Sequence, residues 1–133
     1  TTDLYSVVKA EFIAMRLANL AGIDVAPVKM VKAANKDVVL IERFDRTHNG
    51  QDWTRKSMVS ALTLFGLDDM MARYASYETL AEIIRHRCTN PTDTLRELSS
   101  RLLFNILYCN TDDHARTHAT LSDGNNLSMT HTY

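Results

Sequence analysis

The segment Asn110–Arg116 has the sequence NTDDHAR and is the most polar and most titratable run in the chain. It directly follows Leu102–Cys109, an apolar stretch that ends the longest helix predicted from the sequence. A helix that is apolar nearly all round belongs in a core, and loops positioned by such rigid elements commonly carry functional residues. The junction between this helix and this loop is therefore the first candidate for a functional site.

The residues before this junction are predicted to be largely helical. Asn90 and Pro91 begin the longest helix, since proline is tolerated in a first helical turn. Its apolar side chains recur at helical spacing and are expected to face a core: Leu95, Leu98, Leu102 and Ile106. Helical spacing also predicts helices between Gly50 and Arg87, where strand signals are absent.

The N-terminal part of the chain predicts a helix followed by a β-hairpin. Apolar residues at helical spacing predict a helix over Ser6–Ala21. Two β-rich runs, Val25–Val31 and Val38–Phe44, are separated by the turn-forming residues Ala34–Asp37 and predict a hairpin. Val38–Ile41 is continuously apolar, so this segment is expected to be buried on both faces.

A second small hairpin is predicted after the candidate site. Its strands are His118–Leu121 and Leu127–Thr132, and Ser122–Asn126 supplies the turn. Together these elements predict an α+β fold that is mainly helical, with two small β-hairpins. With 133 residues, 45% of them apolar, the chain is long enough for one compact domain and too short for two.

Composition argues against several classes of partner. The 15 Lys and Arg nearly balance the 16 Asp and Glu, so the basic surface of a nucleic-acid binder is not expected. No apolar run approaches the ~20 residues that span a bilayer. Cys88 and Cys109 are the only cysteines and lack disulfide spacing, which favours a reducing compartment. We expect a cytoplasmic protein that binds neither nucleic acid nor membranes directly.

The order of polar residues after the longest helix is typical of phosphoryl transfer. In protein kinases a catalytic Asp and a magnesium-binding Asn lie five positions apart on one loop, before a short hairpin and a second magnesium-binding Asp. Here Asp112 lies on the predicted loop, Thr117 occupies the fifth position after it, and the predicted hairpin follows. The sequence ends at Tyr133, where the second metal-binding Asp is expected next.

Two sequence strings together resemble a known family. Asn110–Arg116 resembles the catalytic loop of the HipA-like protein serine/threonine kinases, and Ile41–Arg46, with the sequence IERFDR, resembles their signature strand and hinge. Similarity in Tyr5–Glu11 and at Tyr133 extends the resemblance across essentially the whole chain.

The resemblance implies that residues 1–133 form a single HipA-like C-terminal kinase domain fragment, the C-terminal lobe of a protein-kinase-like fold. Residues 1–46 would supply a helix, a hairpin and the hinge, and residues 47–133 the helical lobe with the catalytic loop. The candidate catalytic residues are then Asp112, as the carboxylate near the attacking hydroxyl, and His114, as a support of its loop.

The resemblance also implies a nucleotide site. Glu42 and Phe44 would be hinge residues whose backbone faces adenine, and Asp45 would lie near the ribose. Tyr133 would belong to the same nucleotide-binding set, because the second metal-binding Asp of the family follows the equivalent Tyr. Glu11 is a candidate partner for a phosphate-binding Lys.

Thr117 is the candidate metal ligand. It stands where the family has Asn, and a hydroxyl can ligate magnesium, as the Ser or Thr of a P-loop does. The four glycines are far apart, so no phosphate-covering glycine-rich loop is present, and that segment of the family would precede Thr1. The chain alone is therefore expected to be inactive.

By resemblance, the complete protein would transfer the γ-phosphoryl group of ATP to a protein Ser or Thr, with Mg²⁺ as cofactor, as the toxin of a toxin–antitoxin system. A HipB-like DNA-binding antitoxin would be its partner. Two alternatives stay open. One is a catalytically silent kinase-like module that binds an antitoxin or regulator. The other is a small metalloprotein with a site built from Cys109, Asp112, His114, His118 and His131.

Overall fold

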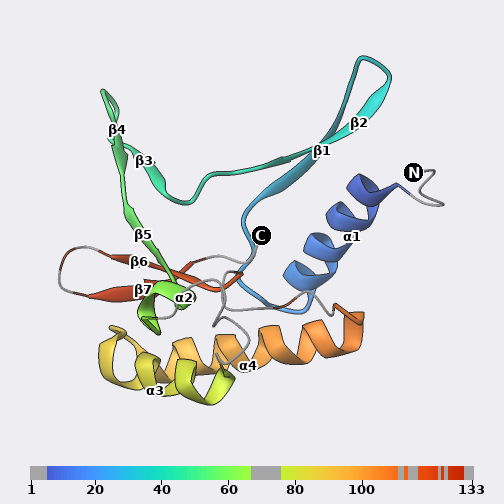
Figure 1. Cartoon of the computed structure of the whole chain (residues 1–133). Helices are drawn as coiled ribbons and strands as arrows, with labels where there is room; N and C mark the ends of the chain where they lie inside the picture. The colour runs from blue at the N-terminus through green and yellow to red at the C-terminus, as the bar shows by residue number, and fades with distance from the viewer. Residues whose placement is uncertain are drawn as a thin grey trace. The chain divides into compact units, whose positions relative to one another are not determined.

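The computed structural model describes residues 6–66, 76–110, 113, 117–122, 124 and 126–130. The chain divides into two compact units, with the boundary between Phe44 and Asp45. Both units combine helices with antiparallel strands, as an α+β fold requires (Figure 1). That the whole chain forms one domain stays a prediction. No helix in the described part of the chain is long and apolar enough to cross a bilayer.

The first unit begins with helix α1, Val7–Leu20, close to the predicted range. Ser6 is its N-cap, because the Ser6 hydroxyl oxygen accepts the backbone N–H of Lys9 at 3.4 Å. Helix α1 packs against both strands of the hairpin that follows it. An ion pair of 3.3 Å joins the ammonium group of Lys9 to the carboxylate of Asp37 on the second strand.

The predicted first hairpin is confirmed, with strands β1, Val28–Ala33, and β2, Lys36–Ile41. A two-residue turn joins them, and both of its residues have positive φ, 48° at Ala34 and 61° at Asn35, as a right-twisted hairpin prefers. The expectation that Val38–Ile41 is buried on both faces is wrong. Strand β2 has β1 as its sheet neighbour in a two-stranded sheet, and Leu40 remains 50% exposed.

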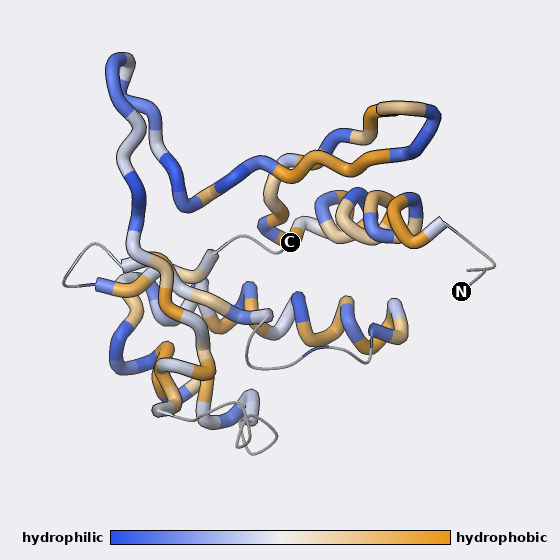
Figure 2. The backbone as a smooth tube through the Cα atoms, turned by 45° about the horizontal axis from the view of Figure 1, so that its top comes forward, coloured by the Kyte–Doolittle hydropathy of each residue, from blue (hydrophilic) through white to orange (hydrophobic). Residues whose placement is uncertain are grey.

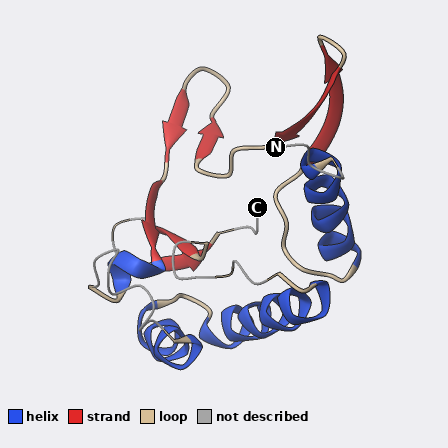
Figure 3. Ribbon diagram, turned by 45° about the vertical axis from the view of Figure 1, so that its right-hand side comes forward, coloured by secondary structure: helices blue, strands red, loops and turns tan. Residues whose placement is uncertain are grey.

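The second unit contains two separate sheets (Figure 3). Strands β3, Arg46–His48, and β4, Trp53–Arg55, form a short hairpin. A three-stranded antiparallel sheet has the order β5-β6-β7, with β5 at Ser57–Ser60, β6 at Ala119–Ser122 and β7 at Leu127–Met129. The pair β6–β7 is the second predicted hairpin, which is thereby confirmed.

The expectation of helices alone between Gly50 and Arg87 is wrong, and the fold has more than two hairpins. Strands β4 and β5 occupy residues 53–55 and 57–60. The β3–β4 hairpin is mostly hydrophilic (Figure 2) and its strand residues are all exposed, so it carries no alternation of apolar and polar residues. Strand β5 pairs with β6, about sixty residues later in sequence, and local sequence does not encode such a pairing.

Three helices accompany the three-stranded sheet: α2 at Ala61–Leu64, α3 at Tyr77–Arg87 and α4 at Pro91–Tyr108. Helices α3 and α4 pack against each other (Figure 1). The buried core of this unit lies where α2, α3 and α4 meet, and it consists of Ala61, Leu62, Leu80, Ile84 and Leu98. Helix α4 begins at Pro91 as predicted, with Asn90 before it.

The second half of α4 is not the buried segment that its composition predicts. Ile106 is 63% exposed and Leu107 is 82% exposed. The buried residues of this helix are Leu98 and Arg101. They lie three positions apart and therefore on one face. A helix that is apolar on several faces does not reveal from its sequence which face is inward, and here that face includes a charged residue.

Replacing Ile84 with Ala is expected to lower the free energy of unfolding by about 2–5 kcal/mol, because Ile84 is 2% exposed and its removal leaves a cavity. The control is Leu107→Ala, at a side chain that is 82% exposed, which should change this free energy by about 0.5 kcal/mol or less. Urea denaturation followed by circular dichroism measures both. Equal losses from the two substitutions would contradict this core.

Candidate functional site

The carboxylate of Asp113 is the centre of a polar network just beyond the end of α4. Its Oδ2 accepts hydrogen bonds from the Tyr77 hydroxyl and from Asn105 Nδ2, the latter at 3.0 Å. Its Oδ1 lies 2.9 Å from His118 Nε2 and accepts the hydroxyl of Thr117 at 2.9 Å. Only 11% of the Asp113 side chain is exposed. A carboxylate has about four acceptor positions, so these donors saturate it.

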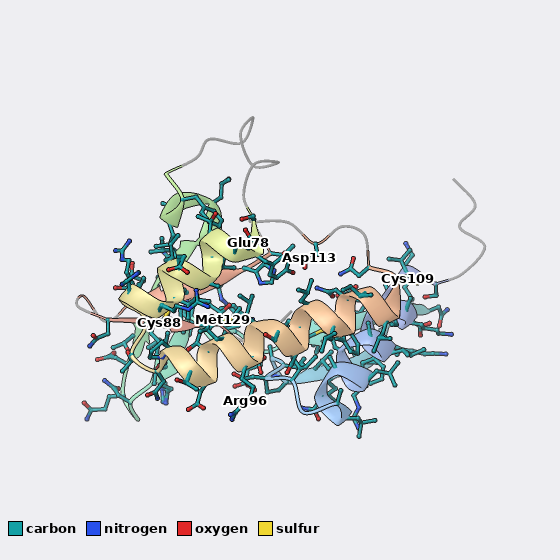
Figure 4. The ribbon with its side chains drawn as sticks, turned by 90° about the horizontal axis from the view of Figure 1, so that it is seen from below. Glu78, Cys88, Arg96, Cys109, Asp113 and Met129 are labelled. Carbon is teal, nitrogen blue, oxygen red and sulfur yellow. The ribbon has the colours of Figure 1, made fainter. Side chains whose placement is uncertain are left out.

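The two donors to Oδ2 come from the ends of two helices. Tyr77 is the first residue of α3, and the Ser76 hydroxyl oxygen caps that helix by accepting the N–H of Thr79 at 3.1 Å. Asn105 lies in the last turn of α4, so the helix itself aims its side chain. Figure 4 shows Asp113 beside the first turn of α3, where Glu78 is labelled.

The end of α4 is held by its own polar residues. Cys109 ends the helix in the left-handed conformation, with φ 58°. The backbone N–H of Asn110 then donates to the carbonyl oxygen of Asn105 at 2.9 Å, and Asn110 Nδ2 donates to Asn105 Oδ1 at 3.3 Å. Asn105 therefore connects the helix end to Asp113 through both ends of its amide.

The donors to Oδ1 come from the residues that lead into β6. Thr117 is exposed, whereas His118 is 7% exposed. The His118 ring also meets Tyr77, with Nε2 3.2 Å from the phenol oxygen and the two rings edge to face at 5.5 Å. The carbonyl oxygen of His118 accepts the N–H of Ala61 at 2.8 Å, which ties the network to the start of α2.

Burial and hydrogen bonding shift the acidities of this network in opposite directions. Burial by itself would raise the pKa of Asp113, but hydrogen bonds from His118 and Tyr77 and the charge of His118 hold that pKa well below its usual value. Burial, and then the hydrogen bond to Asp113 and its negative charge, raise the pKa of the Tyr77 phenol well above its usual value. Asp113 therefore stays ionised and Tyr77 stays protonated at neutral pH.

A buried arginine joins α4 to the residue after β7. Arg101 is 4% exposed, and its Nη2 donates to the carbonyl oxygen of Thr130 at 2.6 Å. Its Nε donates to Glu97 Oε1, one turn earlier on the same helix, at 2.8 Å. These charge-assisted bonds hold Thr130, the residue after β7, against α4.

The structure describes only some of the site residues that the sequence predicts. Asp112, His114 and Tyr133 lie outside the described residues, so their roles stay predictions. Thr117 is described, and its hydroxyl donates its hydrogen to Asp113. It is exposed, and its role as a metal ligand stays a prediction.

The predicted hinge residues belong to different units. Glu42 and Phe44 lie in the first unit and Asp45 in the second. The backbone N–H of Glu42 donates to the carbonyl oxygen of Pro27 at 2.9 Å. Asp45 is 9% exposed, its carboxylate lies 3.7 Å from Arg46 Nε, and its carbonyl oxygen accepts the N–H of Lys56 at 2.8 Å. Glu11 is exposed on α1.

The alternative of a metal site built from Cys109, Asp112, His114, His118 and His131 stays a prediction, because Asp112, His114 and His131 lie outside the described residues. Among the residues that are described, no group of three or more His, Cys, Asp or Glu side chains is arranged to hold a metal ion. His118 Nε2 is used in the contact with Asp113. Both cysteines are free.

Sequence reasoning missed three members of the site: Tyr77, Asn105 and Arg101. Asn105 and Arg101 do leave a signal, because each interrupts the apolar pattern of α4 on a face where a core residue is expected. Tyr77 leaves none, since an aromatic residue after a helix N-cap is ordinary. Asp113 lies in the polar run Asn110–Arg116 and His118 at the start of a predicted strand, but only the fold shows that the two side chains pair.

This arrangement suits the positioning of a loop and not proton transfer by Asp113 itself. A carboxylate with four donors and a lowered pKa is a poor base. The carboxylate instead fixes the direction of the Thr117 hydroxyl group. Phosphoryl transfer, which depends mainly on positioning and charge neutralisation, is a reaction that such a scaffold can serve.

The family model described as the HipA-like C-terminal domain matches residues 2–133. The chain belongs to the family of HipA-like C-terminal domains.

One relative by sequence and one solved structure are similar to this chain. The serine/threonine-protein kinase toxin HipA of Shewanella oneidensis is 26% identical, over 82% of this chain and 29% of the toxin. The solved complex of the HipA, HipB toxin–antitoxin system of Shewanella oneidensis MR-1 with its operator DNA matches with a TM-score of 0.82 and 23% identity, over 98% of this chain and 34% of the matched chain. The structural likeness shows the fold, and the chain spans about a third of the length of these relatives.

Replacing Arg101 with Met should lower the free energy of unfolding by about 3–5 kcal/mol, because it leaves Glu97 and the carbonyl of Thr130 without their buried partner. Arg96→Met is the matched control on the same helix. The Arg96 side chain is 78% exposed, and its Nη1 lies 3.8 Å from Asp93 Oδ1. This change should therefore lower the free energy of unfolding by only about 0–1 kcal/mol. Denaturant titration of both variants measures the difference, and similar costs would contradict the role of Arg101.

The lowered pKa of Asp113 predicts a pH-dependent contribution to stability. Such a group stabilises the fold above the unfolded pKa of about 3.9, and this contribution is lost as pH falls through the folded pKa. Asp113→Asn should therefore cost about 1.5–3 kcal/mol at pH 7, and the cost should shrink below about pH 4. Denaturation at both pH values measures this. A cost that is the same at pH 7 and at pH 3 would refute it.

Proposed function

We propose that this chain is part of a HipA-type serine/threonine protein kinase, which transfers the γ-phosphoryl group of ATP to a Ser or Thr side chain of a protein. Membership of the HipA-like family supports the reaction class, and the name of the Shewanella relative supports the acceptor residues. The observation that carries the proposal is the anchoring of the Asp113 carboxylate by Tyr77, Asn105 and Thr117, because Asp113 follows Asp112 directly in sequence.

In the proposed reaction Asp112 orients the substrate hydroxyl and accepts its proton. The hydroxyl oxygen bonds to the γ-phosphorus of ATP, and the bond between that phosphorus and the oxygen bridging to the β-phosphorus breaks. ADP leaves with the bridging oxygen. His114, two positions after Asp112, would support the loop by hydrogen bonding.

Magnesium, when bound, neutralises charge on the phosphate oxygens. Thr117 is the residue that we assign as its ligand. The Thr117 hydroxyl hydrogen points to Asp113, so the oxygen lone pairs are directed away from that carboxylate. Magnesium is usually held by one or two protein ligands together with substrate phosphates, so a single hydroxyl ligand from this chain is compatible with such a site.

Glu42, Phe44, Asp45 and Tyr133 are the proposed nucleotide-binding residues. The N–H of Glu42 donates to the carbonyl oxygen of Pro27, so the adenine amino group would donate its hydrogen bond to the carbonyl oxygen of Glu42. Asp45 would accept hydrogen bonds from the ribose hydroxyls.

We further propose that the whole protein is the toxin of a toxin–antitoxin pair and acts in the cytoplasm. A HipB-like DNA-binding protein would be its antitoxin. The solved complex with a similar fold contains HipA, HipB and operator DNA, which supports a partner of this kind. The chain itself carries nearly equal numbers of acidic and basic residues, 16 and 15, so contact with DNA through the antitoxin is the simpler arrangement.

Asp112→Asn in the full-length protein should abolish phosphorylation and autophosphorylation with ATP and Mg²⁺, because the amide cannot accept the hydroxyl proton. Transfer of ³²P from labelled ATP measures the loss. The control is Asp52→Asn, at an exposed carboxylate in the β3–β4 turn, which should leave transfer unchanged.

Nucleotide binding and the melting temperature should survive in the Asp112→Asn protein. Undiminished transfer by this variant would refute the assignment of Asp112. An inactive wild-type protein that still binds its antitoxin would instead support the catalytically silent module.

A further inference from the structure

The network around Asp113 reaches the proposed metal ligand directly. Thr117 Oγ1 donates to Asp113 Oδ1 at 2.9 Å, and the other donors hold that carboxylate in place. Because those donors saturate it, Asp113 has no acceptor position left for a metal ion or for a substrate hydroxyl. Any effect that Asp113 has on chemistry must pass through the groups that it holds.

We propose that Asp113 is a positioning residue that orients the hydroxyl oxygen of Thr117 toward the magnesium ion of the bound nucleotide. This inference rests on the proposed function. A threonine hydroxyl hydrogen can rotate, and in water it takes several orientations. A hydrogen bond to an ionised carboxylate selects one of them and is stronger than a bond to a neutral acceptor.

The same hydrogen bond makes the oxygen a better ligand. A donor that gives its hydrogen to a carboxylate gains electron density on its own oxygen, and its lone pairs face away from the carboxylate. Outer carboxylates act in this way on metal-bound side chains, and their removal typically weakens metal binding about 10–100-fold. In this chain the hydrogen bond to Asp113 would make the neutral hydroxyl of Thr117 a stronger magnesium ligand. It would bring the hydroxyl closer in strength to the amide oxygen of the Asn that the family has at this position.

The precision of this arrangement comes from helices and not from the loop. Tyr77 at the start of α3 and Asn105 at the end of α4 fix Asp113 Oδ2, so the direction of Oδ1 is set by two packed helices. His118, which is buried, holds Oδ1 from the side of β6. A ligand supported by residues on rigid elements is held more accurately than one on a loop alone.

The test is a double-mutant cycle in the full-length protein, with binding as its readout. Isothermal titration calorimetry measures the affinity for a non-hydrolysable ATP analogue over a series of Mg²⁺ concentrations. Electron paramagnetic resonance of Mn²⁺ in place of Mg²⁺ reports the ion itself. The variants are Thr117→Val, Asp113→Asn and the combination of both.

Thr117→Val removes the hydroxyl at an exposed position and should raise the Mg²⁺ concentration needed for tight nucleotide binding about tenfold or more. Asp113→Asn should raise this Mg²⁺ concentration about tenfold when Thr117 is present. When Thr117 has been replaced by Val, Asp113→Asn should raise the Mg²⁺ concentration little further. Thr117→Ser, which keeps the hydroxyl, should restore the dependence on Asp113. Metal-independent binding of the nucleotide should change little in any variant.

Tyr77→Phe is the structural control, because it removes a donor from the other oxygen of the same carboxylate. It should lower the melting temperature but shift the Mg²⁺ requirement less than Asp113→Asn does. Equal effects of Asp113→Asn in both Thr117 backgrounds would overturn the inference, and so would an unchanged Mg²⁺ requirement in Thr117→Val. If the wild-type protein shows no Mg²⁺-dependent nucleotide binding, the proposed function fails, and the inference fails with it.

Discussion

Hydrogen bonds from three parts of the chain converge on the carboxylate of Asp113, and the arrangement of the second unit around the site depends on them. Tyr77 contacts the carboxylate from the start of α3, and Asn105 contacts it from the end of α4. Thr117 and His118 contact it from the residues that precede β6. A buried charge without partners would cost several kcal/mol, so the fold is favoured only when all three parts are in place. The apolar core of Leu80, Ile84 and Leu98 packs the same helices. The hydrogen bonds to the carboxylate fix how these helices are oriented, because burial of apolar surface alone does not depend on orientation.

The same constraint links the fold to the proposed chemistry. Phosphoryl transfer is catalysed mainly by accurate placement of charged groups, so a loop that carries a catalytic carboxylate must be held by something rigid. Asp113 adjoins Asp112 in sequence and is held from two helices. Arg101 gives comparable support to the segment after β7, where its guanidinium binds the carbonyl of Thr130. Two charged side chains, Asp113 and Arg101, thus hold the end of α4 and the residue after β7 in place within the second unit.

Local sequence patterns predicted the elements whose signals are local. Helices α1 and α4 follow from apolar spacing and from capping residues, and the hairpins β1–β2 and β6–β7 follow from their turns. The hairpin β3–β4 was missed because its strands are short, polar and exposed, and β5 because its partner is distant in sequence. The exposed face of α4 was missed for a different reason: composition shows that a helix is apolar but not which side is covered. At the site, the sequence singles out Thr117, whereas the contacts of Asn105 and Tyr77 with Asp113 depend on how the helices pack.

The central claim is that the Asp113 carboxylate is ionised, buried and saturated with donors in the native protein. Titration of the ¹³C chemical shift of its carboxyl carbon by NMR measures this directly. The account predicts that the Asp113 signal remains that of a carboxylate to the lowest pH at which the protein stays folded. An Asp113 signal that titrates near the ordinary aspartate pKa of about 3.9 would contradict the account.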